Sequence, residues 1–162
     1  MKYALLALSL LTIVACKKNY EPVVERSHIS YKIDGQLHDI QGKGGMFSQQ
    51  GVETYTTRSG ENKRIVIDSY NRPGTGGYDD VTFTIDTDDP ELFKRYTLYI
   101  QSGSSYYKAG EDYYYADTAK SSLVFTYADD NKIEGLFTFT GLTKDSTSIT
   151  LTDGSFSILK DK

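Results

Sequence analysis

The chain lacks tryptophan, has a single cysteine and three prolines, and carries no basic stripe. One cysteine excludes the intramolecular disulfides that often stabilise small exported domains. The 18 basic and 22 acidic residues give a net charge of −4. Because nucleic-acid binding depends on lysine and arginine side chains that neutralise phosphates, this balance argues against nucleic acid as a partner.

Long apolar runs are also scarce, and the one that stands out lies at the amino terminus. It extends from Ala4 to Val14 and follows Lys2. The run is shorter than the ~20 residues that a membrane-spanning helix needs. A positive start, a short apolar run and a small residue, Ala15, before the cleavage point are typical of a secretory signal peptide. We therefore predict that residues 1–15 form a signal peptide, which is removed.

The cysteine, Cys16, directly follows Ile13-Val14-Ala15. This tetrapeptide resembles the lipobox of bacterial lipoproteins, in which a branched apolar residue stands three places before the modified cysteine. The resemblance implies a diacylglyceryl thioether on Cys16, cleavage before it, and acylation of the new amino terminus. Two or three acyl chains, at about 0.8 kcal/mol for each buried methylene, hold a protein on a membrane effectively permanently.

The next residues are polar and show no apolar period, so we interpret residues 16–26 as the lipidated cysteine and a tether. Such a tether spans at most about 33–36 Å when extended. Lys17, not aspartate, follows the cysteine. The aspartate-type retention signal of other bacterial lipoproteins is therefore absent, which favours the outer membrane as the location. Periplasmic and surface-facing orientations both fit this pattern.

The rest of the chain alternates apolar and polar residues with a period of two, which is typical of half-buried strands. Ile29, Tyr31 and Ile33, for example, share one face, and Asp34-Gly35 marks a tight turn after them. No segment shows the helical period of 3.6. Nine or ten short strands with one-sided alternation predict a single all-β domain over residues 27–162. We expect an antiparallel β-sandwich with almost no helix, and an open β-barrel is the alternative.

The expected strands can be placed from the alternation and the turn signals. The alternating stretches cover residues 29–33, 36–41, 52–58, 64–68, 81–86, 96–100, 123–127, 133–139, 149–151 and 156–158; residues 46–50 follow the glycine-rich connection, and residues 102–121 are expected to be a long loop plus one or two edge strands. A second tight turn is expected at Asp153-Gly154.

Three stretches together resemble a family of small lipoproteins of unassigned function from Bacteroidota-type bacteria. They are Tyr31–Leu37, Ile133–Phe139 and Ile149–Phe156. The resemblance implies a lipobox, a short tether and a β domain that ends in a Gly-x-Phe-x-Phe … Asp-Gly-x-Phe hairpin. Leu37 departs from the family, in which many members have an aromatic residue there. The resemblance implies location and fold, and it brings no catalytic residues with it.

The chain has two histidines, His28 and His38, and the alternation predicts that both point outward from the first hairpin. No serine lies in a nucleophile elbow, and no histidine, cysteine or carboxylate cluster has the spacing of metal ligands. We therefore predict no catalytic residues, no metal and no cofactor. A pocket that joins either histidine to a carboxylate and a hydroxyl would favour an enzyme instead.

Glycine-rich and acidic stretches have simple structural explanations. Gly42–Gly45 and Pro73–Gly77 lack the spacing of a phosphate-binding loop and are interpreted as turns. The acidic segment 86–91 is either a solvated loop or a site for a hard cation such as calcium, and both remain open.

Five of the fourteen tyrosines, Tyr106, Tyr107, Tyr113, Tyr114 and Tyr115, lie close together. Adjacent residues of a strand point to opposite faces, so the three consecutive tyrosines cannot all be buried. Exposed tyrosine is common in recognition sites, because its flat ring also carries a hydroxyl.

These observations predict a cell-envelope lipoprotein that acts as a non-enzymatic structural or interaction module, attached to a membrane through its lipid. The alternative is a glycan- or peptide-binding module that uses the tyrosines of segment 106–115, with a periplasmic or extracellular glycan or protein as partner. The absence of tryptophan weakens the glycan interpretation.

Overall fold

The structure is a computed structural model that describes residues 25–43, 49–59, 62–72, 79–87, 104–108 and 110–159. Several predictions fall outside these residues. They are the signal peptide, Cys16, all but the end of the tether, the strand at 96–100, most of the stretch 46–50, and most of the acidic segment 86–91.

Ten β-strands make up the described chain, and none of its residues is helical. In chain order the strands are β1 (His28–Ile33), β2 (Gln36–Gln41), β3 (Gln50–Ser59), β4 (Asn62–Asn71), β5 (Asp79–Thr87), β6 (Ser105–Lys108), β7 (Tyr114–Ala116), β8 (Ser122–Ala128), β9 (Lys132–Leu142) and β10 (Ser148–Leu159). All pairings between these strands are antiparallel. The prediction of an all-β, antiparallel domain is confirmed.

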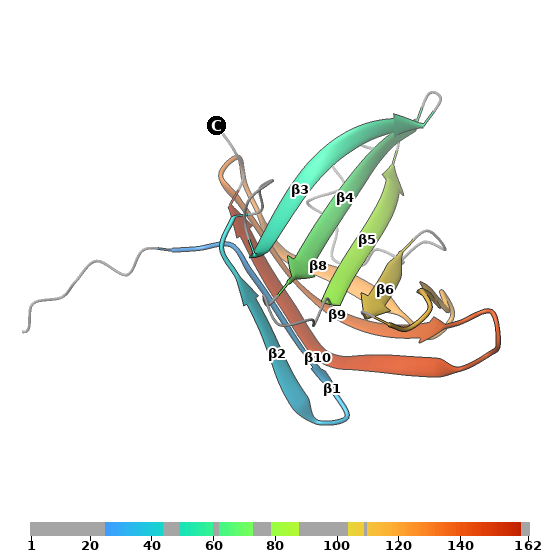
Figure 1. Cartoon of the computed structure of the whole chain (residues 1–162). Helices are drawn as coiled ribbons and strands as arrows, with labels where there is room; N and C mark the ends of the chain where they lie inside the picture. Colours follow the sequence, from blue (N-terminus) through green and yellow to red (C-terminus); the bar gives the residue numbers. More distant parts are fainter. Residues whose placement is uncertain are drawn as a thin grey trace, which may run out of the picture.

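The strands form one sheet in the order β2-β1-β10-β9-β7-β6-β5-β4-β3, with β8 beside β9. The sheet curls until β3, β4 and β5 face β1, β9 and β10 (Figure 1). Its two edges approach each other where Lys43 bridges to Val52, whose amide donates to the Gly42 carbonyl at 3.0 Å. One sheet supplies both layers and is nearly closed, so the architecture corresponds to the open barrel, the second of the two predicted forms.

Strand β9 connects the parts of this sheet. One of its edges pairs with β10 from Lys132 to Leu142. Its other edge is shared, because β8 pairs with residues 133–138 and β7 pairs with Gly141 and Leu142. The carbonyl of Thr140 also accepts from the amide of Asp117 at 2.8 Å, just after β7. Because β9 has neighbours on both edges, its inward side chains lie at the centre of the core.

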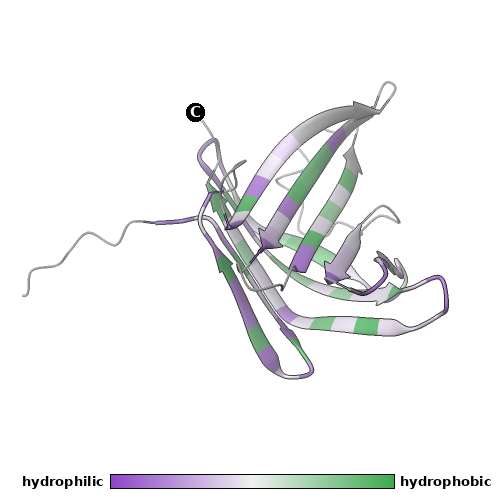
Figure 2. Cartoon of the chain, in the orientation of Figure 1, coloured by the Kyte–Doolittle hydropathy of each residue, from purple (hydrophilic) through white to green (hydrophobic). Residues whose placement is uncertain are grey.

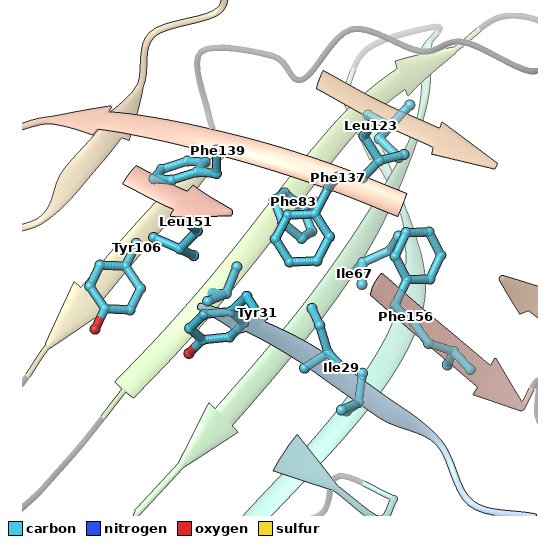
Figure 3. Close-up of a cluster of buried hydrophobic side chains, with 14 of the residues drawn as sticks. Ile29, Tyr31, Ile67, Phe83, Tyr106, Leu123, Phe137, Phe139, Leu151 and Phe156 are labelled. Carbon is cyan, nitrogen blue, oxygen red and sulfur yellow. The ribbon is translucent and has the colours of Figure 1, made fainter. Parts of the chain in front are cut away.

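The residues of the core follow from the alternation of apolar and polar side chains along each strand. Along β9, the buried Ile133, Phe137 and Phe139 alternate with exposed residues, and Figure 2 shows the same banding of hydropathy on other strands. Phe137 meets the ring of Phe83 from β5 edge to face, with centroids 4.6 Å apart (Figure 3). The inward faces expected from the alternation at β1, β5 and β9 are confirmed.

Two glycines allow the aromatic rings to pack against the sheet. A Cβ at Gly154 would lie 2.5 Å from the Phe137 ring, well inside van der Waals contact. At Gly135, a Cβ would lie 2.5 Å from the carbonyl oxygen of Val124 and would also overlap the ring of Phe156. Phenylalanine side chains from neighbouring strands therefore occupy the space above both glycines, which belong to the core.

The expected turn at Asp153-Gly154 is wrong. The chain continues through it, and β10 is a single strand of 12 residues. Its register shifts between Leu151 and Gly154, which is a β-bulge, and Asp153 takes a positive φ of 51°. A bulge and a tight turn both use a residue with positive φ, so the same sequence signal is compatible with either. The chain instead reverses at residues 143–147, where the Thr143 amide donates to the Thr147 carbonyl at 2.9 Å.

Substitutions on β9 test this register. Phe137→Ala or Phe139→Ala is expected to lower the free energy of unfolding by about 3–5 kcal/mol, through lost burial and a cavity. Thr138→Ala, at an exposed position between them, is expected to cost less than about 1 kcal/mol. Urea unfolding followed by circular dichroism gives the three values. If Thr138→Ala is as damaging as either phenylalanine change, the inward and outward faces of β9 are reversed.

Candidate functional site: the tyrosine row and the barrel mouth

The tyrosine-rich segment forms two short neighbouring strands, β6 and β7. They pair antiparallel, with Tyr106 opposite Tyr114 and Ser105 opposite Tyr115. Two short strands are present within residues 102–121 as predicted, but they are not edge strands, because β6 pairs with β5 and β7, and β7 pairs with β6 and β9. Because successive side chains alternate between the two faces of a strand, this pairing divides the five tyrosines into an inner and an outer set.

The inner set consists of Tyr106 and Tyr114, which are buried. The Tyr106 hydroxyl lies 3.4 Å from Asp79 Oδ1, and the Tyr114 hydroxyl donates to Glu111 Oε2 at 2.9 Å. Both side chains belong to the hydrophobic core cluster. They are therefore not available to a partner that docks on the outside of the barrel.

The outer set consists of Tyr107, Tyr113 and Tyr115, which we call the tyrosine row. Tyr113 and Tyr115 are about half exposed, at 50% and 47%, and Tyr107 is partly buried. The Tyr107 and Tyr113 ring centroids lie 4.7 Å apart, and those of Tyr113 and Tyr115 lie 6.2 Å apart. The sequence required at least one of the three consecutive tyrosines to point outward, and two do.

A compact turn between β6 and β7 positions the row. Lys108 Nζ and Glu111 Oε1 form an ion pair at 3.0 Å, and the Glu111 amide donates to the Lys108 carbonyl at 3.0 Å. Gly110 has a positive φ of 84°, which glycine adopts at little cost. Hydrogen bonds from Lys108, and then from Tyr114, lower the pKa of the Glu111 carboxyl. Glu111 thus joins the turn to the core beneath the row.

The two histidines lie on opposite faces of the first hairpin. His28 points outward, with Nδ1 3.4 Å from the Arg26 carbonyl. The outward prediction for His38 is wrong, because the register of β1 and β2 pairs it with the inward residue Tyr31. The two rings stack with centroids 5.2 Å apart and planes only 7° from parallel.

His38 takes part in a polar cluster at one end of the barrel, which we call the mouth cluster: Tyr31, His38, Asp79 and Tyr106. His38 Nδ1 lies 3.5 Å from Asp79 Oδ2, while the other carboxylate oxygen faces Tyr106. Burial, followed by the charge of Asp79, raises the pKa of both tyrosines. Asp79 was missed from sequence, although its spacing of two from Val81 and four from Phe83 places it on the inward face.

The mouth cluster brings together a histidine, a carboxylate and hydroxyls, which is the combination that would favour an enzyme. Nucleophilic catalysis requires the base to contact the nucleophile. Here Asp79 lies between His38 and Tyr106, and the phenol faces the carboxylate instead of the imidazole. The contacts of the mouth cluster therefore do not form a base–nucleophile pair.

Comparison with known proteins adds no relatives. No family model matches the chain, and neither the curated proteins nor the solved structures contain a significant match. The class that the structure itself defines is therefore an all-β protein with one nearly closed antiparallel sheet.

Two absences hold for the residues that the structure describes. Within them, no group of three or more histidine, cysteine, aspartate or glutamate side chains is placed to hold a metal ion. Across the same parts of the chain, no helix has the length and hydrophobicity needed to span a membrane.

Tyr31 and Tyr106 differ in the bonding of their hydroxyls, and this difference is measurable. The Tyr31 hydroxyl is buried and has no hydrogen-bonding partner within the described chain. Leaving a buried polar group unpaired costs about 1–3 kcal/mol, so Tyr31→Phe is expected to leave the free energy of unfolding unchanged or to raise it.

Tyr106→Phe is the matched control, because it removes a hydroxyl that has a carboxylate partner. It is expected to lower the free energy of unfolding by about 1 kcal/mol. Urea unfolding compares the two variants with the unmodified protein. A loss in Tyr31→Phe as large as that in Tyr106→Phe would contradict the assignment of an unpaired hydroxyl.

Proposed function

We propose that this chain is a bacterial cell-envelope lipoprotein. Residues 1–15 direct export, Cys16 carries the lipid, and residues 16–26 tether the domain to the outer membrane. The Ile13–Cys16 tetrapeptide supports this proposal, as does the position of the first strand, which begins at His28 soon after the tether. The resemblance to small lipoproteins rests on the motifs, since the comparisons found no relative.

We infer that the domain acts by binding a partner and not by catalysis. The tyrosine row carries this inference, because Tyr113 and Tyr115 lie side by side on the outside of the barrel with half of each side chain exposed. Exposed aromatic side chains that a rigid sheet holds in place lose little conformational entropy on binding. Tyrosine in particular is enriched at binding hot spots.

The geometry of the row favours a peptide or protein segment over a glycan. A sugar ring typically stacks on an open aromatic face. The centroid distance of 4.7 Å between Tyr107 and Tyr113 brings the faces of these two rings toward each other. Their edges and hydroxyls are then the parts that meet a partner, and both suit contacts with side chains and peptide groups. A glycan partner is the second outcome that the experiment below distinguishes.

Lipidation predicts a specific labelling pattern. Cells that express the full chain and grow with an alkyne fatty acid are expected to yield labelled protein, because acyl chains are attached at Cys16. The Cys16→Ala variant is expected to lose the label and to leave the membrane fraction. Labelling is read by click coupling and gel fluorescence. Persistent labelling of Cys16→Ala would refute the lipoprotein proposal.

If the tyrosine row is the binding surface, the affinity for a partner is expected to depend on its side chains. The full-length protein in detergent is screened against a displayed peptide library and a glycan array. Binding of a peptide is expected, and a Tyr113→Ala, Tyr115→Ala double variant is expected to weaken it at least about tenfold, as loss of a hot spot of about 2 kcal/mol implies. Affinities are measured by biolayer interferometry.

Tyr55→Ala is the matched control, because Tyr55 is exposed to a similar extent, 46%, on β3. It is expected to leave the affinity unchanged. Ligands that come from the glycan array alone would replace the peptide interpretation by the glycan one. Peptide binding that survives the double variant, or no ligand in either screen, would reject the tyrosine row as the binding surface.

A further inference from the structure

The tyrosine row borders on different chemistry at its two ends. On the β9 side, Tyr115 lies opposite Leu142, which is 36% exposed. On the β5 side, Tyr107 lies opposite Asp80. Directly opposite residues of neighbouring antiparallel strands place their side chains on the same face, with Cβ atoms about 4.5–5.5 Å apart. The outer wall of the barrel therefore carries one continuous strip that is apolar at Leu142, aromatic in the middle and acidic at Asp80.

The charged groups around the row are predominantly acidic. Residues 104–120, which include the row and its turn, contain three carboxylates and two lysines. Both lysines are already paired with carboxylates, in the ion pairs Lys108–Glu111 and Lys120–Asp117. The third carboxylate is that of Asp112, an exposed residue directly before Tyr113. Asp112 and Asp80 therefore add negative charge that the two lysines do not balance.

The negative region extends from Asp80 over the outer face of β4 and β3. The Thr82 hydroxyl donates to Asp68 Oδ1 at 2.8 Å and lies 3.4 Å from Asp80 Oδ1. Glu53 lies opposite Asp68. Burial raises the pKa of Tyr55 on the same face, and the negative charges of these three carboxylates raise it further. Tyr55 itself lies on β3, three strands from β6, and so stays outside the row.

One cation on this face shows how an arginine fits beside a tyrosine and a carboxylate. Tyr70 of β4 lies opposite Asp80, and the guanidinium carbon of Arg72 is 4.9 Å from the centre of the Tyr70 ring. A cation within about 6 Å of a ring centroid is attracted by the negative face of the ring, and the planar guanidinium also stacks on it. The exposed rings of the row, with Asp112 and Asp80 beside them, offer the same combination to an arginine of another chain.

We propose that the segment bound by the tyrosine row is basic, with arginine or lysine toward Asp80 and an apolar residue toward Leu142. This inference rests on the proposed peptide-binding function and specifies the chemistry of its partner. From β9 to β5 the strip crosses three strand spacings, or about 14 Å at about 4.8 Å each. An extended segment of about four or five residues covers that length. Opposite charges also steer such a segment to the surface and accelerate association.

The test compares three octapeptides on the full-length protein in detergent, by biolayer interferometry. The first alternates leucine and arginine, the second has citrulline, an uncharged analogue of arginine, in place of each arginine, and the third has glutamate there. The arginine peptide is expected to bind at least about tenfold more tightly than the citrulline peptide, and the glutamate peptide is expected to bind most weakly. Raising the salt from about 0.01 M to about 1 M shortens the screening length from about 30 Å to about 3 Å, and is expected to remove most of this difference.

The combined variant Asp80→Asn, Asp112→Asn is expected to weaken binding of the arginine peptide about fivefold, because exposed ion pairs contribute little each, and to leave the citrulline peptide unaffected. Asp39→Asn with Asp130→Asn is the matched control, because it removes the same charge from two exposed carboxylates, on β2 and in the β8–β9 turn. No change is expected for the control. Thermal unfolding confirms that each variant is folded, and Asp112→Asn alone decides the result if the combined variant is not.

The outcomes separate this inference from the proposed function. A citrulline peptide that binds as tightly as the arginine peptide, and that loses affinity in the Tyr113→Ala, Tyr115→Ala variant, overturns this inference alone. Binding of the arginine peptide that survives the loss of Asp80 and Asp112 also overturns it. No binding of the arginine peptide has the same consequence, while the library screen still decides the proposed function. Binding of the arginine peptide that the double tyrosine variant leaves unchanged rejects both.

Discussion

The contact between Phe83 and Phe137 is the interaction on which the barrel depends, because it joins walls that do not share backbone hydrogen bonds. Phe83 lies on β5 and Phe137 on β9, and their rings meet edge to face. In the sheet these strands are separated by β6 and β7, which are short and pair at only two positions. Burial of apolar rings between facing walls is therefore what favours the curled sheet over a flat one.

That contact also constrains the backbone around it. Phe137 lies directly over Gly154, where no side chain fits, and Gly154 follows the bulge at Asp153. On the outer surface, Asp153 accepts from Lys32 Nζ at 2.9 Å, which ties the bulge to β1. The irregularity of β10 is thus the local adjustment that lets a long strand pair with both β1 and β9 while the aromatic core stays close-packed.

The apolar core ends at the barrel mouth, and the two candidate sites meet on one strand there. Within β6, Tyr106 belongs to the mouth cluster and the next residue, Tyr107, belongs to the tyrosine row. The interior changes from phenylalanine to tyrosine, histidine and aspartate within a few residues of Phe137, since Tyr31 lies 6.4 Å from that ring. A polar interior with an unpaired hydroxyl is less stable than an apolar one, and such departures from a well-packed core are expected at functional sites.

Several features of this protein can be predicted from its sequence alone. The period of two along β1, β5 and β9 predicts strands and their inward residues, because alternation depends only on the geometry of one extended chain. The same holds for the impossibility of burying Tyr113, Tyr114 and Tyr115 together. The interpretation of Ile13–Cys16 as a lipobox also rests on sequence alone, because such a motif is recognised as a short linear segment.

Only the tertiary structure decided the remaining features, because most of them depend on pairing between residues that are distant in the chain. His38 is the exception, because the error there was local: the tight turn at Asp34-Gly35 already pairs it with the inward residue Tyr31. Asp153-Gly154 indicates a positive φ, yet only the pairing of β10 with β9 makes it a bulge instead of a turn. The mouth cluster combines residues 31 and 38 of the first hairpin with residues 79 and 106 of the adjacent strands β5 and β6, and these two pairs meet only when the sheet closes on itself. Local pattern determines which face of a strand is apolar, while register and closure determine which side chains meet.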